Sequence, residues 1–441
     1  MIPLLLSLVA GAVGPRGPTC AGPVGDEDGH HLDAPRPKLS GPVQTRLVDG
    51  GAFRLHWTDE GADRVSAELL QWAEAELVEV RAHLESSDWQ RLVGDDGTGG
   101  DAAIDAYFVS IDANGYANPV TPEDGAGGAS CFVRFDPDIR SYNETVARSI
   151  VRHELMHCAQ YRYTWDSHAW LYEASATYEQ YRPAPDQVTL ALLTNVLWGE
   201  RIGEPNRRLD DVDGRFEYAG LMWFKFLEED QGAPPWAVWE ALEAEPEWAA
   251  GLDLAARDGV AEAFTRFSAF NQAACAGEDR SALGGYQAGN ASCTASFEAP
   301  REVWDWPTLE IELLPAWTSV TYTFSRPADE APGTVPHVSC TAGEGVLGVV
   351  LDTPEDGAVV WLDRVVAEGA TPARSHLETP PEGEVLLVLA AASDLNVSGR
   401  CAVDWRLPPE EGGCACSSGP AGGGLPALAL LGLLIVRRRR P

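Results

Sequence analysis

The sequence predicts an α+β protein in which a helix-rich unit is followed by a smaller all-β unit. Over residues 61–86, apolar residues recur at three- and four-residue steps, which is the period of a helix with one buried face, and further helices are expected up to residue 273. After about residue 300 the pattern changes to short β-rich runs separated by Gly and Pro, which is typical of a small β-sandwich. The chain has 441 residues, 45% of them hydrophobic, so it is long enough to build two folded units.

The helix-rich unit has recognisable elements. We expect a first helix over 61–86, strands over 103–110 and 129–135, and turns between these strands at Asn114-Gly115 and Asn118-Pro119. Asn143 is a fair N-cap for the longest helix. Further helices are expected over 169–181, 187–198, 216–228, 235–243 and 260–273.

These patterns set the domain boundaries. We place the helix-rich domain at 51–275 and the β-sandwich at 301–408, joined by a linker at 276–300. A Pro/Gly-rich stretch at 13–50 is expected to be a second linker. The strands of the sandwich are expected over 320–324, 346–351, 359–363, 385–390 and 401–405.

The two ends of the chain have the features of targeting signals. Residues 1–12 form a short apolar run that ends in a small-residue cleavage site, as in a signal peptide. At the other end, residues 409–441 contain a Gly413-Cys414 motif, a short apolar run over 425–436 and an arginine cluster. This tail resembles the C-terminal sorting signals of myxobacterial surface proteins. The resemblance implies an exported protein on the cell surface or outer envelope, or released from it, whose tail is transiently in the membrane and is cut near Cys414 by a sorting protease. A plain membrane anchor is the alternative.

The net charge restricts the classes of partner that we expect, and the cysteine content indicates the cellular compartment. The chain has 67 acidic against 32 basic residues, a formal net charge of -35, which would repel nucleic acid. Nine cysteines are more typical of an exported protein than of a cytosolic enzyme. The expected pairs are Cys131 with Cys158, Cys275 with Cys293 and Cys340 with Cys401, although sequence alone does not fix the connectivity.

The most informative motif is His153-Glu154-Leu155-Met156-His157. Two histidines four residues apart lie on one face of a helix, so both imidazoles can reach one metal ion. Glu154 projects beside them and can hold a water molecule without being a ligand. Because these groups interrupt an otherwise apolar stripe, they need partners or a metal to offset their burial.

A catalytic zinc site needs a third protein ligand, and the sequence offers several candidates. A histidine six residues after His157 is absent, since that position is Tyr163, and Gln160 stands where the same pattern needs Gly. His168 lies in an irregular segment. Glu173 is better placed, because it lies on a second helix whose small residues permit close packing, and Glu179 would face another direction on that helix.

The stretch Trp170-Leu171-Tyr172-Glu173-Ala174-Ser175-Ala176 after this motif resembles the gluzincin metallopeptidases, the thermolysin- and aminopeptidase-like zinc enzymes. The resemblance covers about residues 51–273. It implies a zincin-like, thermolysin-like catalytic domain, Zn²⁺ held by His153, His157 and Glu173, and Glu154 as the catalytic base. The chain departs from that family in having Ala174 in place of Gly, and Thr177 where thermolysin-like enzymes place an Asp that orients the histidines.

The expected activity is zinc-dependent hydrolysis of peptide bonds in a protein or peptide substrate. Glu154 would take a proton from the attacking water, and Tyr218 is the candidate donor to the oxyanion. The strand over 129–135 is expected to be the sheet edge along which a peptide binds. Two alternatives remain open, a surface adhesin or binding protein with a vestigial zinc site, and a zinc hydrolase of non-peptide substrates.

Overall fold

A computed structural model gives the fold, and it describes residues 34–407 with internal gaps. The signal peptide at 1–12, the helix expected over 187–198, the Cys275–Cys293 pair and the tail at 409–441 lie outside the described residues. The gaps are at 96, 98–99, 122–127, 166, 182–200, 202–203, 274–300, 305–307, 344–345, 353–358, 361–364, 367–372 and 377–384.

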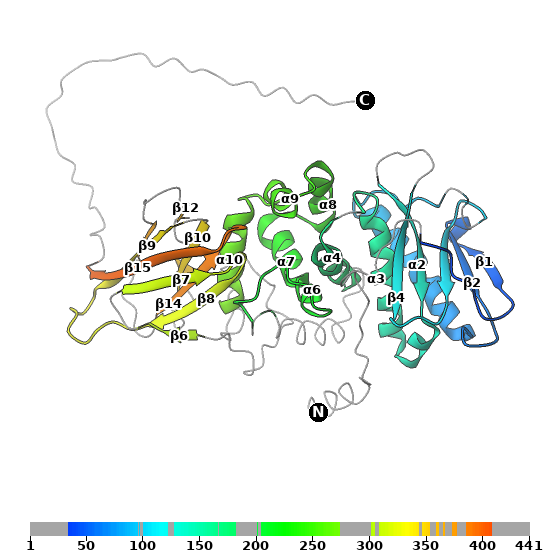
Figure 1. The fold of residues 1–441 in the computed structure, drawn as a ribbon, viewed down its shortest axis with the longest axis horizontal. Helices are drawn as coiled ribbons and strands as arrows, with labels where there is room; N and C mark the ends of the chain where they lie inside the picture. Colours follow the sequence, from blue (N-terminus) through cyan, green and yellow to red (C-terminus); the bar gives the residue numbers. More distant parts are fainter. Residues whose placement is uncertain are drawn as a thin grey trace, which may run out of the picture.

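The molecule is mixed α/β and elongated, with three layers of structure along its length (Figure 1). A β-sheet with helices α2 (Ala67–Ser86) and α3 (Glu144–Gln160) forms one end, a group of helices occupies the middle, and a β-sandwich forms the other end. The order along the chain therefore follows the order along the long axis.

The N-terminal sheet has five strands in the order β1-β2-β3-β5-β4. The three central strands are parallel, and each of the two outer strands is antiparallel to its neighbour. The strands are β1 (Gln44–Val48), β2 (Phe53–Trp57), β3 (Ile104–Phe108), β4 (Gly115–Val120) and β5 (Ser130–Phe135). Residues 44–48 are thus part of the sheet, and the expected linker over 13–50 is wrong for these residues.

Strand β4 corrects two expectations. Asn114-Gly115 and Asn118-Pro119 were expected to mark turns, but Gly115 pairs with Phe135 and Pro119 with Cys131 in an antiparallel ladder. Proline is tolerated there because β4 is an outer strand, where an N–H on the open side is not needed. Strand β5 lies between β3 and β4, so β4, and not the strand over 129–135, is the edge among the described residues.

Helix α3 (Glu144–Gln160) is the central element of this half of the molecule. The Asn143 side chain accepts a hydrogen bond from the amide of Val146 at 3.0 Å, which confirms the predicted N-cap. Every residue over 149–160 is buried, because α3 packs against strands β4 and β5 and against helices α2 (Ala67–Ser86) and α4 (Ala169–Tyr181). Helix α2 begins later than the expected residue 61, after Ser66, whose side chain caps the amide of Leu69.

The middle of the molecule is helical. The expected helix over 216–228 is divided into two short helices and a π-helical turn. One helix that was not predicted, α9 (Trp248–Ala255), follows α8 (Pro235–Ala244). None of the helices in the described part of the chain is long and apolar enough to cross a membrane. The elements are α6 (Phe216–Ala219), α7 (Leu221–Phe226), η3 (Leu227–Gln231), α8 (Pro235–Ala244), α9 (Trp248–Ala255) and α10 (Val260–Ala273).

The C-terminal part consists of two sheets that enclose a common apolar core, as expected for a sandwich. One sheet has the order β11-β10-β14-β8-β6, with β12 also paired to β10, and the other has the order β13-β9-β15-β7. The strands are β6 (Arg301–Val303), β7 (Thr308–Leu314), β8 (Ser319–Phe324), β9 (Val335–Ala342), β10 (Val346–Asp352), β11 (Val359–Val360), β12 (Val365–Val366), β13 (Ala373–His376), β14 (Val385–Ala391) and β15 (Val397–Arg406).

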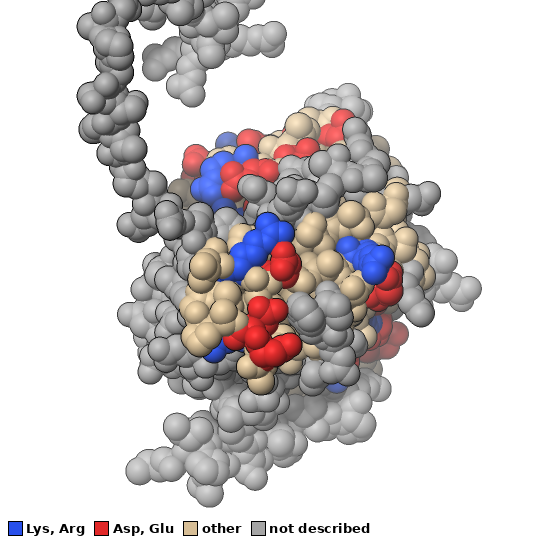
Figure 2. Space-filling model, turned by 90° about the vertical axis from the view of Figure 1, so that its left-hand side faces the viewer, with Lys and Arg blue, Asp and Glu red and all other residues tan. Residues whose placement is uncertain are grey.

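The expected pair Cys340–Cys401 is a disulfide across neighbouring strands β9 and β15. Figure 2 views the sandwich end of the molecule and shows acidic and basic side chains interspersed among uncharged ones. The described residues of this face therefore form no large patch of one charge that would identify a ligand.

The helices and the sandwich share a core at Trp317. This side chain is 1% exposed, and its ring centroid lies 4.9 Å from that of Trp248 and 5.5 Å from that of Phe264. Its backbone oxygen accepts from the amide of Leu209 at 3.0 Å. The sandwich is thus packed against the helices rather than only tethered to them.

Candidate metal centre

Three side chains from two neighbouring helices converge at one buried point. Helix α3 carries His153 and His157 one turn apart, and α4 brings Glu173 opposite them. Nε2 of His153 lies 3.1 Å from Nε2 of His157 and 3.1 Å from Oε2 of Glu173. Nε2 of His157 lies 3.5 Å from Oε1 of Glu173. The predicted ligand set is therefore brought together by the packing of α3 on α4.

The donor atoms fit a zinc ion in kind and in spacing. Two imidazole nitrogens and one carboxylate are a common ligand set of catalytic zinc, with a fourth position left for water. Ligand atoms at the usual Zn–N distance and at tetrahedral angles would lie roughly 3.3 Å from one another. The three separations of 3.1, 3.1 and 3.5 Å are close to that value.

Burial shifts the pKa of each of these groups in the direction that favours its uncharged form. The pKa of His153 is lowered to about 4 by burial, which the hydrogen bond from its Nδ1 to Gln180 partly opposes. Burial also lowers the pKa of His157 to about 4, against the attraction of Glu173. The pKa of Glu173 is raised to about 7 by burial, opposed by His157 and by a hydrogen bond from Tyr218. Both imidazoles are thus neutral near pH 7, as metal ligation requires.

Glu154, the expected base, lies between α3 and strand β4. It is 1% exposed, and the Gly115 backbone is so close that a Cβ atom there would lie 2.9 Å from Oε1 of Glu154. The carboxylate is therefore held next to the edge strand of the sheet, on the same helix as the two histidines.

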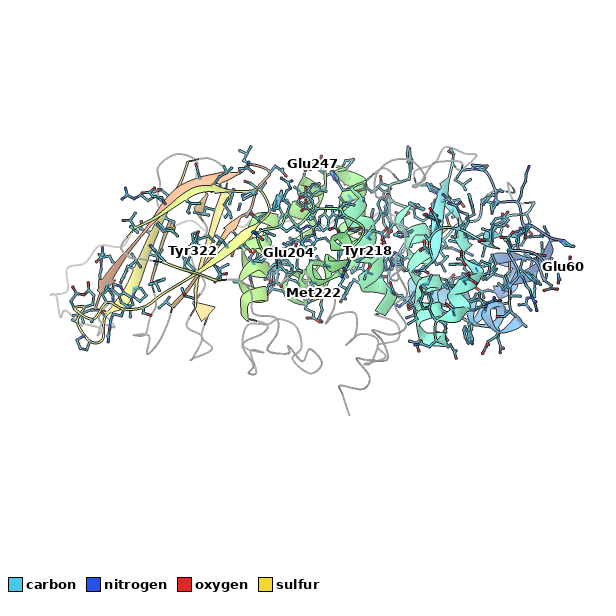
Figure 3. The ribbon with its side chains drawn as sticks, turned by 60° about the horizontal axis from the view of Figure 1, so that its bottom comes forward. Glu60, Glu204, Tyr218, Met222, Glu247 and Tyr322 are labelled. Carbon is cyan, nitrogen blue, oxygen red and sulfur yellow. A yellow bond between two sulfur atoms is a disulfide. The ribbon has the colours of Figure 1, made fainter. Side chains whose placement is uncertain are left out.

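Tyr218 also lies at this centre, although it comes from the helix α6 further along the chain. Its hydroxyl hydrogen-bonds Glu173, and its ring centroid is 6.0 Å from that of His153. Figure 3 shows Tyr218 among the central helices, far from Glu60 at one end and from Tyr322 in the sandwich. The phenol thus has access to the ligand set.

The rival ligands have other surroundings. His168 is exposed and lies beside Trp248, with ring centroids 6.3 Å apart. Glu179 is buried, but its Oε2 lies 2.9 Å from Nε2 of His83 on α2. Among the described residues, His153, His157 and Glu173 form the one group of three side chains with the geometry to hold a metal ion.

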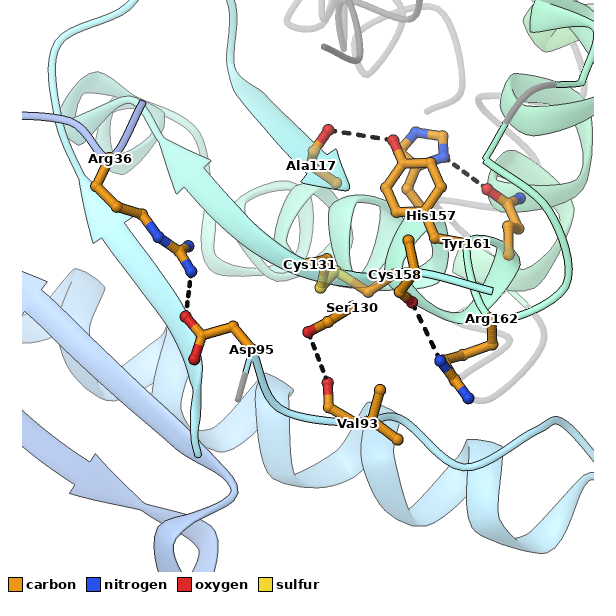
Figure 4. The surroundings of a disulfide bond; sticks show 12 residues. Arg36, Val93, Asp95, Ala117, Ser130, Cys131, His157, Cys158, Tyr161 and Arg162 are labelled. Atoms are coloured by element: carbon orange, nitrogen blue, oxygen red, sulfur yellow. Dashed lines mark hydrogen bonds and ion pairs between the residues drawn. A yellow bond between two sulfur atoms is a disulfide. The ribbon is translucent and has the colours of Figure 1, made fainter. Parts of the chain in front are cut away.

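A disulfide links helix α3, which carries the two histidines, to the sheet (Figure 4). Cys158, next to His157, is bonded to Cys131 on β5, which confirms the expected pair. The hydroxyl of Tyr161 donates to the backbone oxygen of Ala117 on β4 at 3.1 Å. The end of α3 is thereby held against both strands. Two disulfides also indicate a protein of an oxidising compartment, such as the extracellular space.

Two glutamines at the centre were not predicted. Nδ1 of His153 lies 3.0 Å from Oε1 of Gln180, and Nδ1 of His157 lies 2.7 Å from Oε1 of Gln160. In the sequence, Gln160 is notable only because it stands where another zinc-binding pattern needs Gly. Gln160 lies three residues after His157, so the two side chains share one face of the helix. This spacing was the feature of the sequence that could have identified Gln160 as a partner of His157.

No protein family and no curated protein matches the chain. Among solved structures, the pre-peptidase C-terminal domain of a collagenase from Bacillus anthracis is similar to part of it, at 15% sequence identity and a TM-score of 0.19. The match covers 24% of this chain and 95% of that domain. A likeness this low supports no conclusion about fold or function.

Proposed function

We propose that the protein is a zinc-dependent peptidase of the gluzincin type with a zincin-like catalytic domain. The observation that carries the proposal is the convergence of His153, His157 and Glu173 at one buried point, with Glu154 on the same helix. Buried polar groups without a compensating ion would be costly, and a divalent cation offsets that cost.

Zinc, when bound, would supply Lewis acidity and lower the pKa of its water toward neutrality. Glu154 would accept the proton of the attacking water and pass it to the leaving nitrogen of the peptide. Tyr218 would donate a hydrogen bond to the oxygen that gains negative charge. The burial of Glu154 strengthens these interactions, since it lowers the local dielectric constant.

The substrate backbone would bind along β4. This strand is the sheet edge next to Glu154, and an extended peptide can add to such an edge through main-chain hydrogen bonds. Pro119 removes one donor from the strand, so the peptide would pair mainly nearer Gly115. This position favours a peptide over a compact non-peptide substrate.

The test is metal analysis combined with digestion of a peptide library by the full chain and by Glu154→Gln. We expect about one zinc per chain in both proteins and peptide cleavage by the wild type alone. Residual activity above a tenth of wild type, on the order of 1.4 kcal/mol or less of lost barrier stabilisation, would point to another base.

The same experiment separates the alternatives. A surface adhesin or binding protein with a vestigial site would cleave nothing with zinc bound. A zinc hydrolase of non-peptide substrates would cleave esters or other acyl substrates in a Glu154-dependent way but leave the peptides intact. Either result would overturn the proposal of a peptidase.

We also propose that the protein is exported to the cell surface. The disulfides at Cys131–Cys158 and Cys340–Cys401 support an oxidising compartment. The signal peptide and the sorting tail rest on sequence alone. Intact-mass measurement should show that the mature protein ends near Cys414, and retention of residues 425–441 would favour the simple membrane anchor.

A further inference from the structure

We propose that Gln160 and Gln180 are positioning residues of the metal centre, which fix the tautomers of His157 and His153 so that both Nε2 lone pairs point at the metal. This inference rests on the proposed zinc site. It assigns to two neutral carboxamides the orienting role that the resemblance gave to an Asp at position 177.

The orientation of the Gln160 amide follows from its partners. Its Nε2 lies 2.9 Å from the backbone oxygen of Tyr172, which has no hydrogen to donate. The nitrogen end must therefore face that carbonyl, and the oxygen end faces Nδ1 of His157 at 2.7 Å. A carboxamide oxygen only accepts, so Nδ1 carries the proton and Nε2 keeps its lone pair.

Gln160 also joins the two helices that supply the ligands. Besides Tyr172, its Nε2 donates to Oγ of Ser175 on α4 at 2.8 Å. Oγ of Ser175 accepts a further hydrogen bond from Nε1 of Trp239 at 3.0 Å, so this partner is itself fixed. One side chain thus orients His157 on α3 and ties α3 to the helix that carries Glu173.

Gln180 acts in the same way on His153, from the end of α4. Its Oε1 lies 3.0 Å from Nδ1 of His153. The backbone oxygen of Gln180 accepts from Arg152 at 2.8 Å, and Arg152 is ion-paired with the buried Glu76 of α2. The main chain at Gln180 is therefore held by the residue that precedes His153.

Position 177 does not serve this purpose. The Thr177 side chain is 2% exposed, and its Oγ1 has no hydrogen-bond partner among the described residues. Carboxamides add no negative charge to a buried site that already holds Glu173. With both Nδ1 atoms protonated, the two Nε2 atoms, 3.1 Å apart, each carry a lone pair, an arrangement that a cation stabilises.

The test uses Gln160→Met and Gln180→Met in the full chain, with Gln231→Met as the matched control. Gln231 is also buried and hydrogen-bonded through both ends of its amide, to Asp230 and Asp258. We expect chelator competition to show a 10- to 100-fold weaker zinc affinity, an order of magnitude usual for outer-shell partners, in the first two variants and at most a twofold change in the control.

Glutamate substitutions separate the two roles. Gln180→Glu keeps an acceptor for His153 and should keep zinc affinity within a few-fold of wild type. Gln160→Glu also keeps an acceptor, but it loses both N–H donors and puts an oxygen against the Tyr172 carbonyl. It should therefore bind zinc as weakly as Gln160→Met.

A readout without zinc keeps this inference distinct from the proposed function. Nitrogen-15 NMR of the zinc-free wild type should show both histidines protonated at Nδ1, and each Met variant should lose that preference at its own histidine. Protonation at Nε2 in the wild type, or unchanged zinc affinity in both Met variants, would overturn the inference. A correct tautomer without zinc binding would instead count against the peptidase. If Gln160→Met does not fold, the wild-type tautomer of His157 still decides.

Discussion

The backbone of Gly115 lies directly against the carboxylate of Glu154. A Cβ atom at position 115 would stand 2.6 Å from Cγ and 2.9 Å from Cδ of Glu154, closer than real Cβ contacts occur. The edge strand and the expected base can therefore occupy their places only because residue 115 has no side chain.

Gly115→Ala should displace Glu154 without removing a metal ligand. We expect full zinc content and a loss of roughly 100-fold in kcat/KM, since a shift of about 1 Å in a catalytic group has this effect. Gly343→Ala is the control, because its new Cβ would meet mainly the movable hydroxyl of Ser398, in the sandwich. Normal turnover by Gly115→Ala would show that Glu154 does not act from this position.

Glu173→Ala should abolish tight zinc binding, whereas His168→Ala and Glu179→Ala should leave about one zinc per folded chain. Glu173 is the carboxylate within 3.5 Å of both histidines, while His168 is exposed and Glu179 is bonded to His83. Zinc content after dialysis measures all three. If His168→Ala loses the metal and Glu173→Ala keeps it, the gluzincin assignment is wrong.

Asp95→Asn should change how the free energy of unfolding depends on pH. Burial raises the pKa of Asp95 to about 6, helped by Asp105 and opposed by Arg36. The folded state therefore binds a proton more readily than the unfolded state. The stabilisation of the folded wild type by protonated Asp95 is complete below about pH 4 and is lost as the pH rises through 6. Relative to wild type, the variant should therefore gain stability as the pH rises from 4 to 7.

Denaturant unfolding at several pH values measures this difference. Asp101→Asn is the control, because a hydrogen bond from Arg54 lowers the pKa of Asp101, so its contribution is constant above about pH 4. If the difference in unfolding free energy between Asp95→Asn and wild type stays constant from pH 4 to 7, the pKa of Asp95 is not raised.

Trp317→Ala should uncouple the sandwich from the helices. The ring is shared between Trp248, Phe264 and the sandwich, and removing it should cost about 3–5 kcal/mol. We expect calorimetry to show one transition for wild type and two for this variant. Trp405→Ala, in the sandwich core alone, should lower the stability of the sandwich without changing its coupling to the helices. A single, unshifted transition in Trp317→Ala would show that the shared core contributes little.

The sequence by itself determined helix α3 and the metal-site residues that this helix carries. The four-residue spacing of His153 and His157 fixes their common face once α3 forms, and the Asn143 cap is equally local. The change to short β-rich runs separated by Gly and Pro after residue 300 likewise predicted the sandwich, because strand-forming and turn-forming residues act within short segments. Local periodicity is sufficient for such features.

Only the tertiary structure decided which strand is the edge and which residues orient the histidines. Asn114-Gly115 and Asn118-Pro119 favour turns locally, but pairing with β5 overrides that preference and makes Gly115–Val120 a strand. Gln180 reaches His153 because α4 packs across α3, and Tyr218 reaches Glu173 from α6. Gln160 is local to His157, but the contact that orients its amide comes from Tyr172 on α4. These contacts join segments that are distant in the chain, and their free energy depends on packing that no local pattern encodes.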